Sequence, residues 1–149
     1  MIVLVDIDNT ISDARWRDPW LGDWERYYLE GSYDCPVLPI IRMVNSLSLC
    51  GDTIIHLTGR PERWRELTLR WMVRHEVRTD GLIMRPDDDF SPTAELKIRL
   101  ARDLFGEDLP GAGVGLMIDD VERVLEPFRA AGVSTLLTVL GGSPCAPSI

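Results

Sequence analysis

Short runs of apolar residues alternate along the chain with longer segments in which apolar residues recur every three or four positions. The short runs predict buried strands at residues 2–5, 53–57, 81–84, 113–118 and 134–139. The longer segments predict helices at about residues 36–50, 61–75, 92–105 and 121–131. Strands that alternate with helices indicate an α/β fold, in which helices cover both faces of a parallel sheet.

The length and composition suit a single domain. The chain has 149 residues, of which 45% are hydrophobic, enough for one packed core. We expect this domain to span residues 1–140, with a small irregular flap at about 12–34 and a loose C-terminal tail at 141–149. No stretch approaches the roughly 20 apolar residues of a membrane span, so we expect no membrane partner.

The net charge and the cysteine content indicate which kinds of partner and which cellular compartment to expect. The formal net charge of −8 argues against broad, non-specific binding to nucleic acid, but it allows a local basic site. The three cysteines, Cys35, Cys50 and Cys145, are an odd number without metal-ligand spacing. The first apolar run is also too short for a secretory leader. We therefore expect a cytoplasmic protein with reduced cysteines.

Polar residues gather where the predicted strands end. In an open parallel sheet the ligand binds beyond the carboxyl ends of the strands. A single Asp at such a position is often only a turn residue, whereas several polar groups on one edge indicate a site. The residues that follow the first, second and fourth strands are Asp6 and Asp8, then Thr58, Gly59 and Arg60, and then Asp119 and Asp120.

Carboxylates crowded on one edge repel each other, and a hard cation such as Mg²⁺ relieves this repulsion through oxygen ligands. Asp6, the backbone carbonyl of Asp8, and Asp119 are the candidate ligands. Asp120 either binds or orients the metal, or it caps the helix that begins near residue 121. The sequence thus predicts a magnesium site at this edge.

The same residues suit phosphoryl transfer. Asp6 can attack phosphorus to form an aspartyl-phosphate, and Asp8 can act as general acid and then as general base. The Thr58 hydroxyl, the Gly59 amide and the Lys97 ammonium can offset charge on the phosphoryl oxygens. Thr58 alone is more typical of a turn and Lys97 alone of a solvated helix, but their place in the set favours phosphate contacts.

The order Asp6-x-Asp8-x-Thr10, Thr58, Lys97 and Asp119-Asp120 resembles the haloacid dehalogenase (HAD) superfamily over nearly the whole chain. The resemblance implies a three-layer Rossmann-like fold with strand order 5-4-1-2-3. It also implies the roles given above for Asp6, Asp8, Thr58 and Lys97, with magnesium bound. The second acid, Asp8, is typical of the phosphatases of this superfamily rather than of its dehalogenases.

A narrower resemblance is to the 3′-phosphatase domain of polynucleotide kinase/phosphatase. It lies in Thr58-Gly59-Arg60-Pro61, with Thr68 and Trp71 in the next helix, and in Ile118-Asp119-Asp120 followed by Val133. The resemblance implies that Arg17 and Arg60 matter for activity. We add Gly59, Asn9 and Thr10 to these two arginines as candidate substrate-binding residues. The chain departs from the family with Thr93 at a position that is often acidic, with Asn9 where glycine is common, and in having no kinase motif.

The gaps between the motifs leave room for a minimal cap or none, so we expect an open site that admits a bulky substrate. Aromatic residues of the flap, such as Trp24, Tyr27 and Tyr28, either stack on bases or pack onto the core or a dimer partner. The leading hypothesis is a phosphatase that removes 3′-phosphates from nucleic-acid ends or nucleotides. The alternatives are a 5′(3′)-deoxyribonucleotidase that acts on free nucleotides and a catalytically silent binding module; a homodimer is possible.

Overall fold

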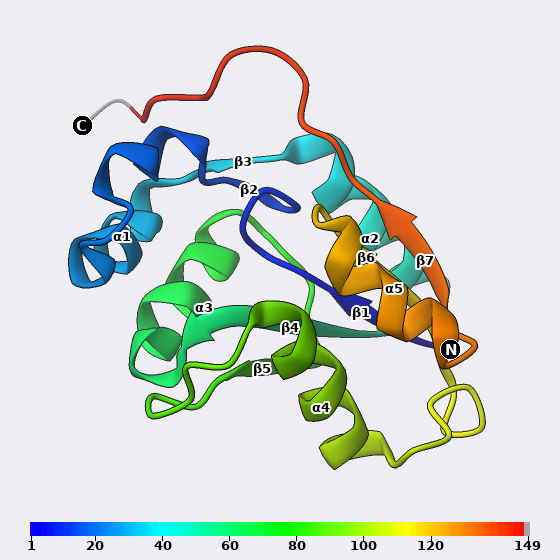
Figure 1. The fold of residues 1–149 in the computed structure, drawn as a ribbon. Helices are drawn as coiled ribbons and strands as arrows, with labels where there is room; N and C mark the ends of the chain where they lie inside the picture. The colour runs from blue at the N-terminus through cyan, green and yellow to red at the C-terminus, as the bar shows by residue number, and fades with distance from the viewer. Residues whose placement is uncertain (148–149) are drawn as a thin grey trace.

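A computed structural model describes residues 1–147, and its centre is one parallel sheet of five strands (Figure 1). Counted along the chain, these strands lie in the order 3-2-1-4-5, which is the predicted order 5-4-1-2-3 read from the opposite edge. The labels in the figure differ because the pattern does not predict two short strands, β2 (Ser12–Asp13) and β3 (Cys35–Pro36). Across the sheet the strands are β5 (Gly81–Arg85), β4 (Thr53–Pro61), β1 (Ile2–Val5), β6 (Val114–Asp119) and β7 (Ser134–Leu137).

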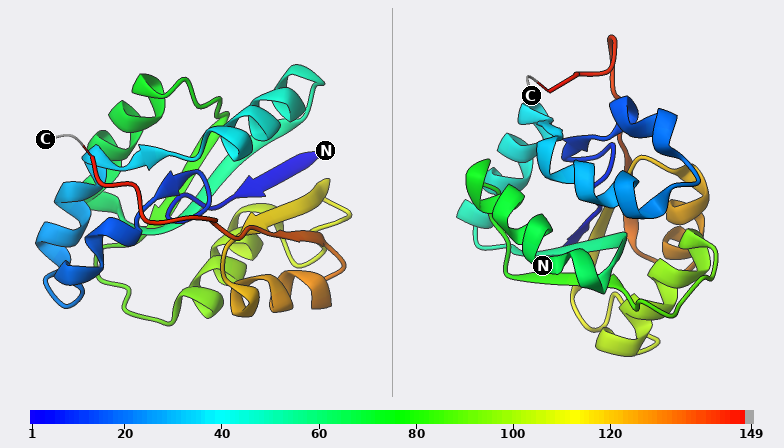
Figure 2. Two further views of the ribbon diagram at one scale, coloured as in Figure 1. Left: turned by 90° about the horizontal axis from the view of Figure 1, so that it is seen from above. Right: turned by 90° about the vertical axis from the view of Figure 1, so that its left-hand side faces the viewer.

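Helices cover both faces of the sheet, so the predicted three-layer α/β fold is confirmed (Figures 1 and 2). One face packs against α2 (Leu38–Leu49) and α3 (Arg65–Arg74). The other packs against α4 (Thr93–Phe105) and α5 (Glu122–Ala130). No helix within residues 1–147 is both long and apolar enough to cross a membrane.

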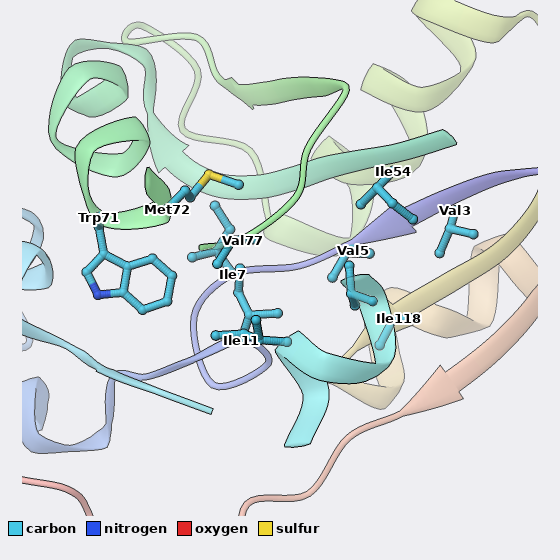
Figure 3. Packing of buried hydrophobic residues seen from close by; sticks show 11 residues of the cluster. Val3, Val5, Ile7, Ile11, Ile54, Trp71, Met72, Val77 and Ile118 are labelled. Carbon is cyan, nitrogen blue, oxygen red and sulfur yellow. The ribbon is translucent and has the colours of Figure 1, made fainter. Parts of the chain in front are cut away.

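The side chains of β1 alternate between two hydrophobic cores. Val3 and Val5 join a cluster that includes Trp71 of α3 (Figure 3). Leu4 points to the other face and joins a cluster that includes Phe128 of α5. Both faces of this strand are thus covered, which explains why it is a continuous apolar run and why its three valine and leucine side chains are fully buried. The carboxyl end of β1 is therefore held rigidly at the centre of the sheet.

The segment at residues 12–34, here called the flap, contains more regular structure than the sequence predicts. It includes 3-10 turns at Arg15–Trp20 and Gly31–Tyr33 and the short helix α1 (Trp24–Glu30). At its base, β2 (Ser12–Asp13) pairs antiparallel with β3 (Cys35–Pro36). The flap thus leaves and re-enters the domain through one small sheet.

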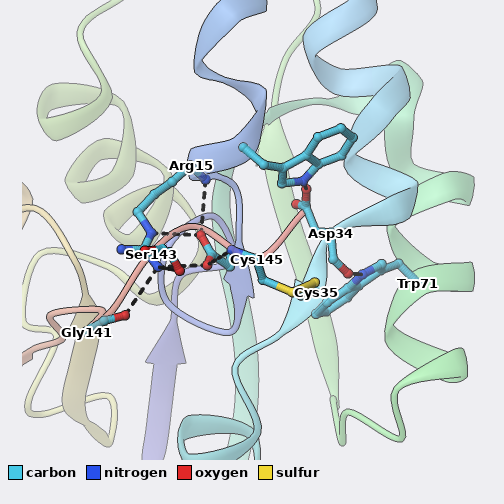
Figure 4. Close-up of a disulfide and its surroundings, with 9 residues drawn as sticks. Arg15, Asp34, Cys35, Trp71, Gly141, Ser143 and Cys145 are labelled. Atoms are coloured by element: carbon cyan, nitrogen blue, oxygen red, sulfur yellow. Dashed lines mark hydrogen bonds and ion pairs between the residues drawn. A yellow bond between two sulfur atoms is a disulfide. The ribbon is translucent and has the colours of Figure 1, made fainter. Parts of the chain in front are cut away.

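A disulfide joins Cys35 to Cys145, across 110 residues of sequence (Figure 4). The expectation of reduced cysteines is therefore wrong for this pair, and only Cys50, which is exposed, is free. Arg15 also donates to the carbonyls of Gly141, Gly142 and Ser143, so the described part of the tail is held rather than loose. The spacing of cysteines in a sequence does not reveal which distant pair the fold brings together.

We expect Cys145→Ser to lower the free energy of unfolding by roughly 2 to 5 kcal/mol, because the crosslink restricts a long loop of the unfolded chain. Cys50→Ser is the matched control and should leave stability unchanged, since Cys50 is exposed and unbonded. Urea titrations of both variants under non-reducing conditions measure the difference. Equal stability of the two variants would contradict the crosslink.

His56 on β4 is fully buried, and its Nδ1 lies 3.1 Å from Thr79 Oγ1. Burial lowers the pKa of His56 from 6.5 to about 3. Below pH 6.5 the unfolded chain therefore binds a proton that the folded protein does not, so stability falls as pH falls. Because of this histidine, we expect the free energy of unfolding to fall by about 2 kcal/mol between pH 7 and pH 5. His56→Leu should lack this contribution, and an identical pH dependence in both proteins would contradict the assignment.

Candidate active site

Three acidic residues meet at the carboxyl edge of the central strands. Asp6 follows β1 directly, Asp119 ends β6, and Asp120 is the next residue. Carboxylate oxygens of the three lie within 4.8 Å of one another. Because β1 and β6 pair in parallel register, the topology alone brings these distant residues together. The clustering expected from the sequence is therefore observed for these carboxylates.

Lys97 of α4 lies among these carboxylates rather than in solvent. Its Nζ donates to Asp6 and, at 2.7 Å, to Asp119. Burial alone would lower the pKa of Lys97, but the charges of Asp6 and Asp119 outweigh it and hold that pKa above its ordinary value. Thr10 adds a hydrogen bond of 3.1 Å from its hydroxyl to the Asp6 carboxylate. The orientation of Asp6 is thus fixed by two neighbours.

The crowded carboxylates also disturb one another electrostatically. Burial raises the pKa of Asp6 to about 8, and the charges of Asp119 and Asp120 add to this rise against the opposing charge of Lys97. Burial and the charge of Asp119 raise the pKa of Asp120 to about 6. A divalent cation would relieve this repulsion, and three carboxylates within reach of one point are a donor set that fits Mg²⁺.

Asp8 has different neighbours from Asp6. Its carboxylate accepts from Arg60 Nη2 at 2.7 Å and Nε at 3.0 Å, and also from Arg17 Nη2. Burial would raise the pKa of Asp8, but Arg60 and Arg17 outweigh it and hold that pKa well below its usual range. The two acids of the first motif therefore belong to two separate charge clusters, one with Lys97 and one with the arginines.

Asp34, which the sequence did not single out, binds both arginines of the second cluster. It accepts from Arg17 at 2.9 and 2.8 Å and from Arg60 at 3.2 Å, and it is 1% exposed. Trp16 donates to its side chain at 2.8 Å. Trp71 donates to its backbone carbonyl, also at 2.8 Å (Figure 4). Because Asp34 comes from the irregular flap and belongs to no motif, the sequence held no signal that pairs it with the arginines.

Arg17 is anchored on all sides although it comes from the flap. Its side chain is fully buried, and its Nη1 donates to the carbonyl of Tyr27 at 2.8 Å. The Tyr27 ring lies 4.3 Å from the guanidinium carbon, which is a cation–π distance. The flap therefore packs onto the site through Arg17.

The remaining candidates lie on the turns that border the two clusters. Thr58 is buried, and its hydroxyl accepts from the Arg60 amide at 3.2 Å. Gly59 offers its carbonyl to Arg85 at 3.0 Å. Asn9 has a positive φ of 61°, which explains why glycine would also suit its position, and its side chain accepts from the Ala14 amide at 3.0 Å. In this structure these three residues shape the turns around the carboxylates.

Comparison with known proteins agrees with this arrangement. The family model of the polynucleotide kinase PNKP phosphatase domain matches residues 1–141. No curated protein matches the chain. A chain of the Pnkp1/Rnl/Hen1 RNA repair complex superposes with a TM-score of 0.76 at 24% identity, covering 92% of this chain and 42% of that one. The chain thus spans less than half the length of that relative.

Two further solved structures share the fold. A hydrolase from Streptococcus pneumoniae TIGR4 superposes with a TM-score of 0.61 at 13% identity, covering 93% of this chain and 92% of its own. The D,D-heptose 1,7-bisphosphate phosphatase from B. bronchiseptica, complexed with magnesium and phosphate, gives 0.55 at 16% identity and covers 91% and 79%. The match along residues 1–141 shows that the chain belongs to the HAD-type polynucleotide kinase PNKP phosphatase domain family and is a phosphatase.

Proposed function

We propose that the protein is a magnesium-dependent phosphomonoesterase that removes 3′-phosphates from nucleic-acid ends through an aspartyl-phosphate on Asp6. The observation that carries the proposal is the position of Asp6 at the rigid end of the central strand, where it contacts Lys97 and lies beside the two acids at the end of β6. The family match supports the nucleic-acid substrate.

Asp6, Asp119 and Asp120 would hold the metal, together with the backbone carbonyl of Asp8. The side chain of Asp8 is engaged by Arg17 and Arg60, so a backbone contact from this residue is consistent with the cluster. When bound, Mg²⁺ would offset the negative charge of the carboxylates and allow a phosphate dianion to approach.

In the first step a carboxylate oxygen of Asp6 forms a bond to phosphorus, while the bond from phosphorus to the sugar oxygen breaks. The substrate dianion draws Arg17 and Arg60 away from Asp8, so Asp8 can carry the proton that it gives to that leaving oxygen. In the second step Asp8 takes a proton from water, which attacks phosphorus and releases Asp6 and inorganic phosphate. The ionised form of Asp8, which the arginines favour, is the form required for the second step.

The phosphoryl oxygens carry negative charge during both steps and need hydrogen-bond donors to stabilise it. The Thr58 hydroxyl accepts from the Arg60 amide, which leaves the hydroxyl proton available for a phosphoryl oxygen. The Gly59 amide and Lys97 are the further donors that we propose. Arg17 and Arg60 would contact the substrate as its dianion competes with Asp8 for their guanidinium groups.

A substrate panel tests the proposal. With Mg²⁺, we expect phosphate release from a 3′-phosphorylated oligonucleotide and little release from nucleoside 5′-monophosphates. Removal of the metal with a chelator should abolish the activity, and Asp119→Asn should lower metal affinity about 10-fold or more. The reverse substrate preference would favour a deoxyribonucleotidase. No hydrolysis of any phosphate ester, an aryl phosphate included, would favour a silent binding module.

A further inference from the structure

A cleft of about 400 Å³ lies beside the site, between α1 and the loop that joins β5 to α4. We propose that this cleft binds a nucleobase from the last two nucleotides of the substrate. This inference rests on the proposed function, because it names the part of a nucleic-acid end that the enzyme recognises beyond its phosphate.

The cleft presents aromatic surface from both sides. Trp24 contributes from α1 and is 51% exposed, although its ring stacks on Tyr28 with centroids 6.2 Å apart. Phe90 contributes from the facing loop and is 89% exposed. Two large apolar rings that stay in solvent gain free energy when a flat partner covers them, and every nucleobase offers such a face.

The charges around the cleft suit an uncharged ring better than a second phosphate. Arg85 already donates to the backbone carbonyls of Gly59, Asp89 and Ser91 and to the Thr93 hydroxyl. Its guanidinium group is therefore occupied by these hydrogen bonds, which hold the wall of the cleft, and it has no pair of N–H donors left for an anion. Two acids also line the cleft, Asp87 and Asp89, of which Asp89 is paired with Arg99. The other arginine of the lining, Arg63, is paired with Glu25 at 3.6 Å.

The cleft shares its supporting elements with the two arginines of the site. Pro61 lines it and directly follows Arg60, which holds Asp8. Tyr28 lines it and directly follows Tyr27, whose ring packs on Arg17. A nucleotide whose 3′-phosphate lies at Asp6 can therefore extend its base, or that of the preceding residue, toward this cleft.

The test compares two 3′-phosphorylated oligonucleotides that differ only in their last two residues. In one oligonucleotide these residues carry bases, and in the other they are stable reduced abasic residues. Phe90→Ala and Trp24→Ala should each lower kcat/KM on the base-bearing substrate roughly 5- to 150-fold, since stacking contributes about 1–3 kcal/mol per base. Both variants should leave the abasic substrate and an aryl phosphate within about twofold of wild type. Leu29→Ala is the matched control, because Leu29 is an exposed residue of α1 that does not line the cleft.

Equal losses on the two oligonucleotides, or no loss on either, would overturn the cleft proposal while leaving the phosphatase proposal intact. If the wild type hydrolyses an aryl phosphate but neither oligonucleotide, the proposed substrate is wrong. The cleft is then tested by anisotropy with labelled 3′-hydroxyl oligonucleotides. The cleft proposal is supported if the wild type binds the base-bearing strand more tightly than the abasic strand and Phe90→Ala removes this difference. Equal binding of both strands by the wild type overturns it.

Discussion

Asp6→Asn is expected to lower kcat on any phosphate ester by at least about 1000-fold, because an amide is a far poorer nucleophile than a carboxylate. The substitution also removes one of three carboxylates from the candidate metal site. Phosphate release measured at saturating Mg²⁺ separates the loss of the nucleophile from weaker metal binding.

Asp103→Asn serves as the matched control, since Asp103 is an exposed carboxylate on the same helix as Lys97. It should retain wild-type activity. A fully active Asp6→Asn protein would remove Asp6 from the chemistry altogether, and the assignment of β1 as the strand that delivers the nucleophile would be wrong.

Asp34→Asn should be the second most damaging change, acting on stability and activity together. Asp34 neutralises two guanidinium groups that are almost fully buried, and loss of one partner from such a network costs about 3–5 kcal/mol. Asp8 would then be the one carboxylate still paired with Arg17 and Arg60. We expect this loss to shift both side chains and to lower kcat/KM about 100-fold. Urea titration and steady-state kinetics measure the two effects.

Asp18→Asn is the control on the same flap, because Asp18 is exposed. It should change neither quantity. If Asp34→Asn lost stability but kept full activity at a temperature where it remains folded, Asp34 would support the flap without positioning the arginines.

Much of the fold follows from the sequence pattern for a physical reason. A strand such as β1 is covered on both faces, and this coverage leaves the short continuous apolar run that is typical of a buried parallel strand. The parallel sheet then brings Asp6, Asp119 and Asp120 to one edge, so their proximity follows from topology without knowledge of any side-chain conformation.

The features that the sequence did not reveal depend on packing between distant, irregular segments. Asp34 meets Arg17 and Arg60 only because the flap folds back over the site. Cys35 meets Cys145 only because the tail returns along β2 and β3. The pairing of Asp8 with two arginines, rather than with the metal cluster, likewise depends on side-chain directions that spacing does not specify.

The most direct test of the central claim is to trap the phosphorylated enzyme. An aryl phosphate has a leaving group that needs no proton, so Asp8→Asn should still complete the first step but should stall before hydrolysis. Acid quench and peptide mapping of this variant should find close to one phosphoryl group per chain on the peptide that contains Asp6, with a matching burst of aryl alcohol. A phosphoryl group on any other residue, or steady turnover at the wild-type rate without a burst, would contradict the account.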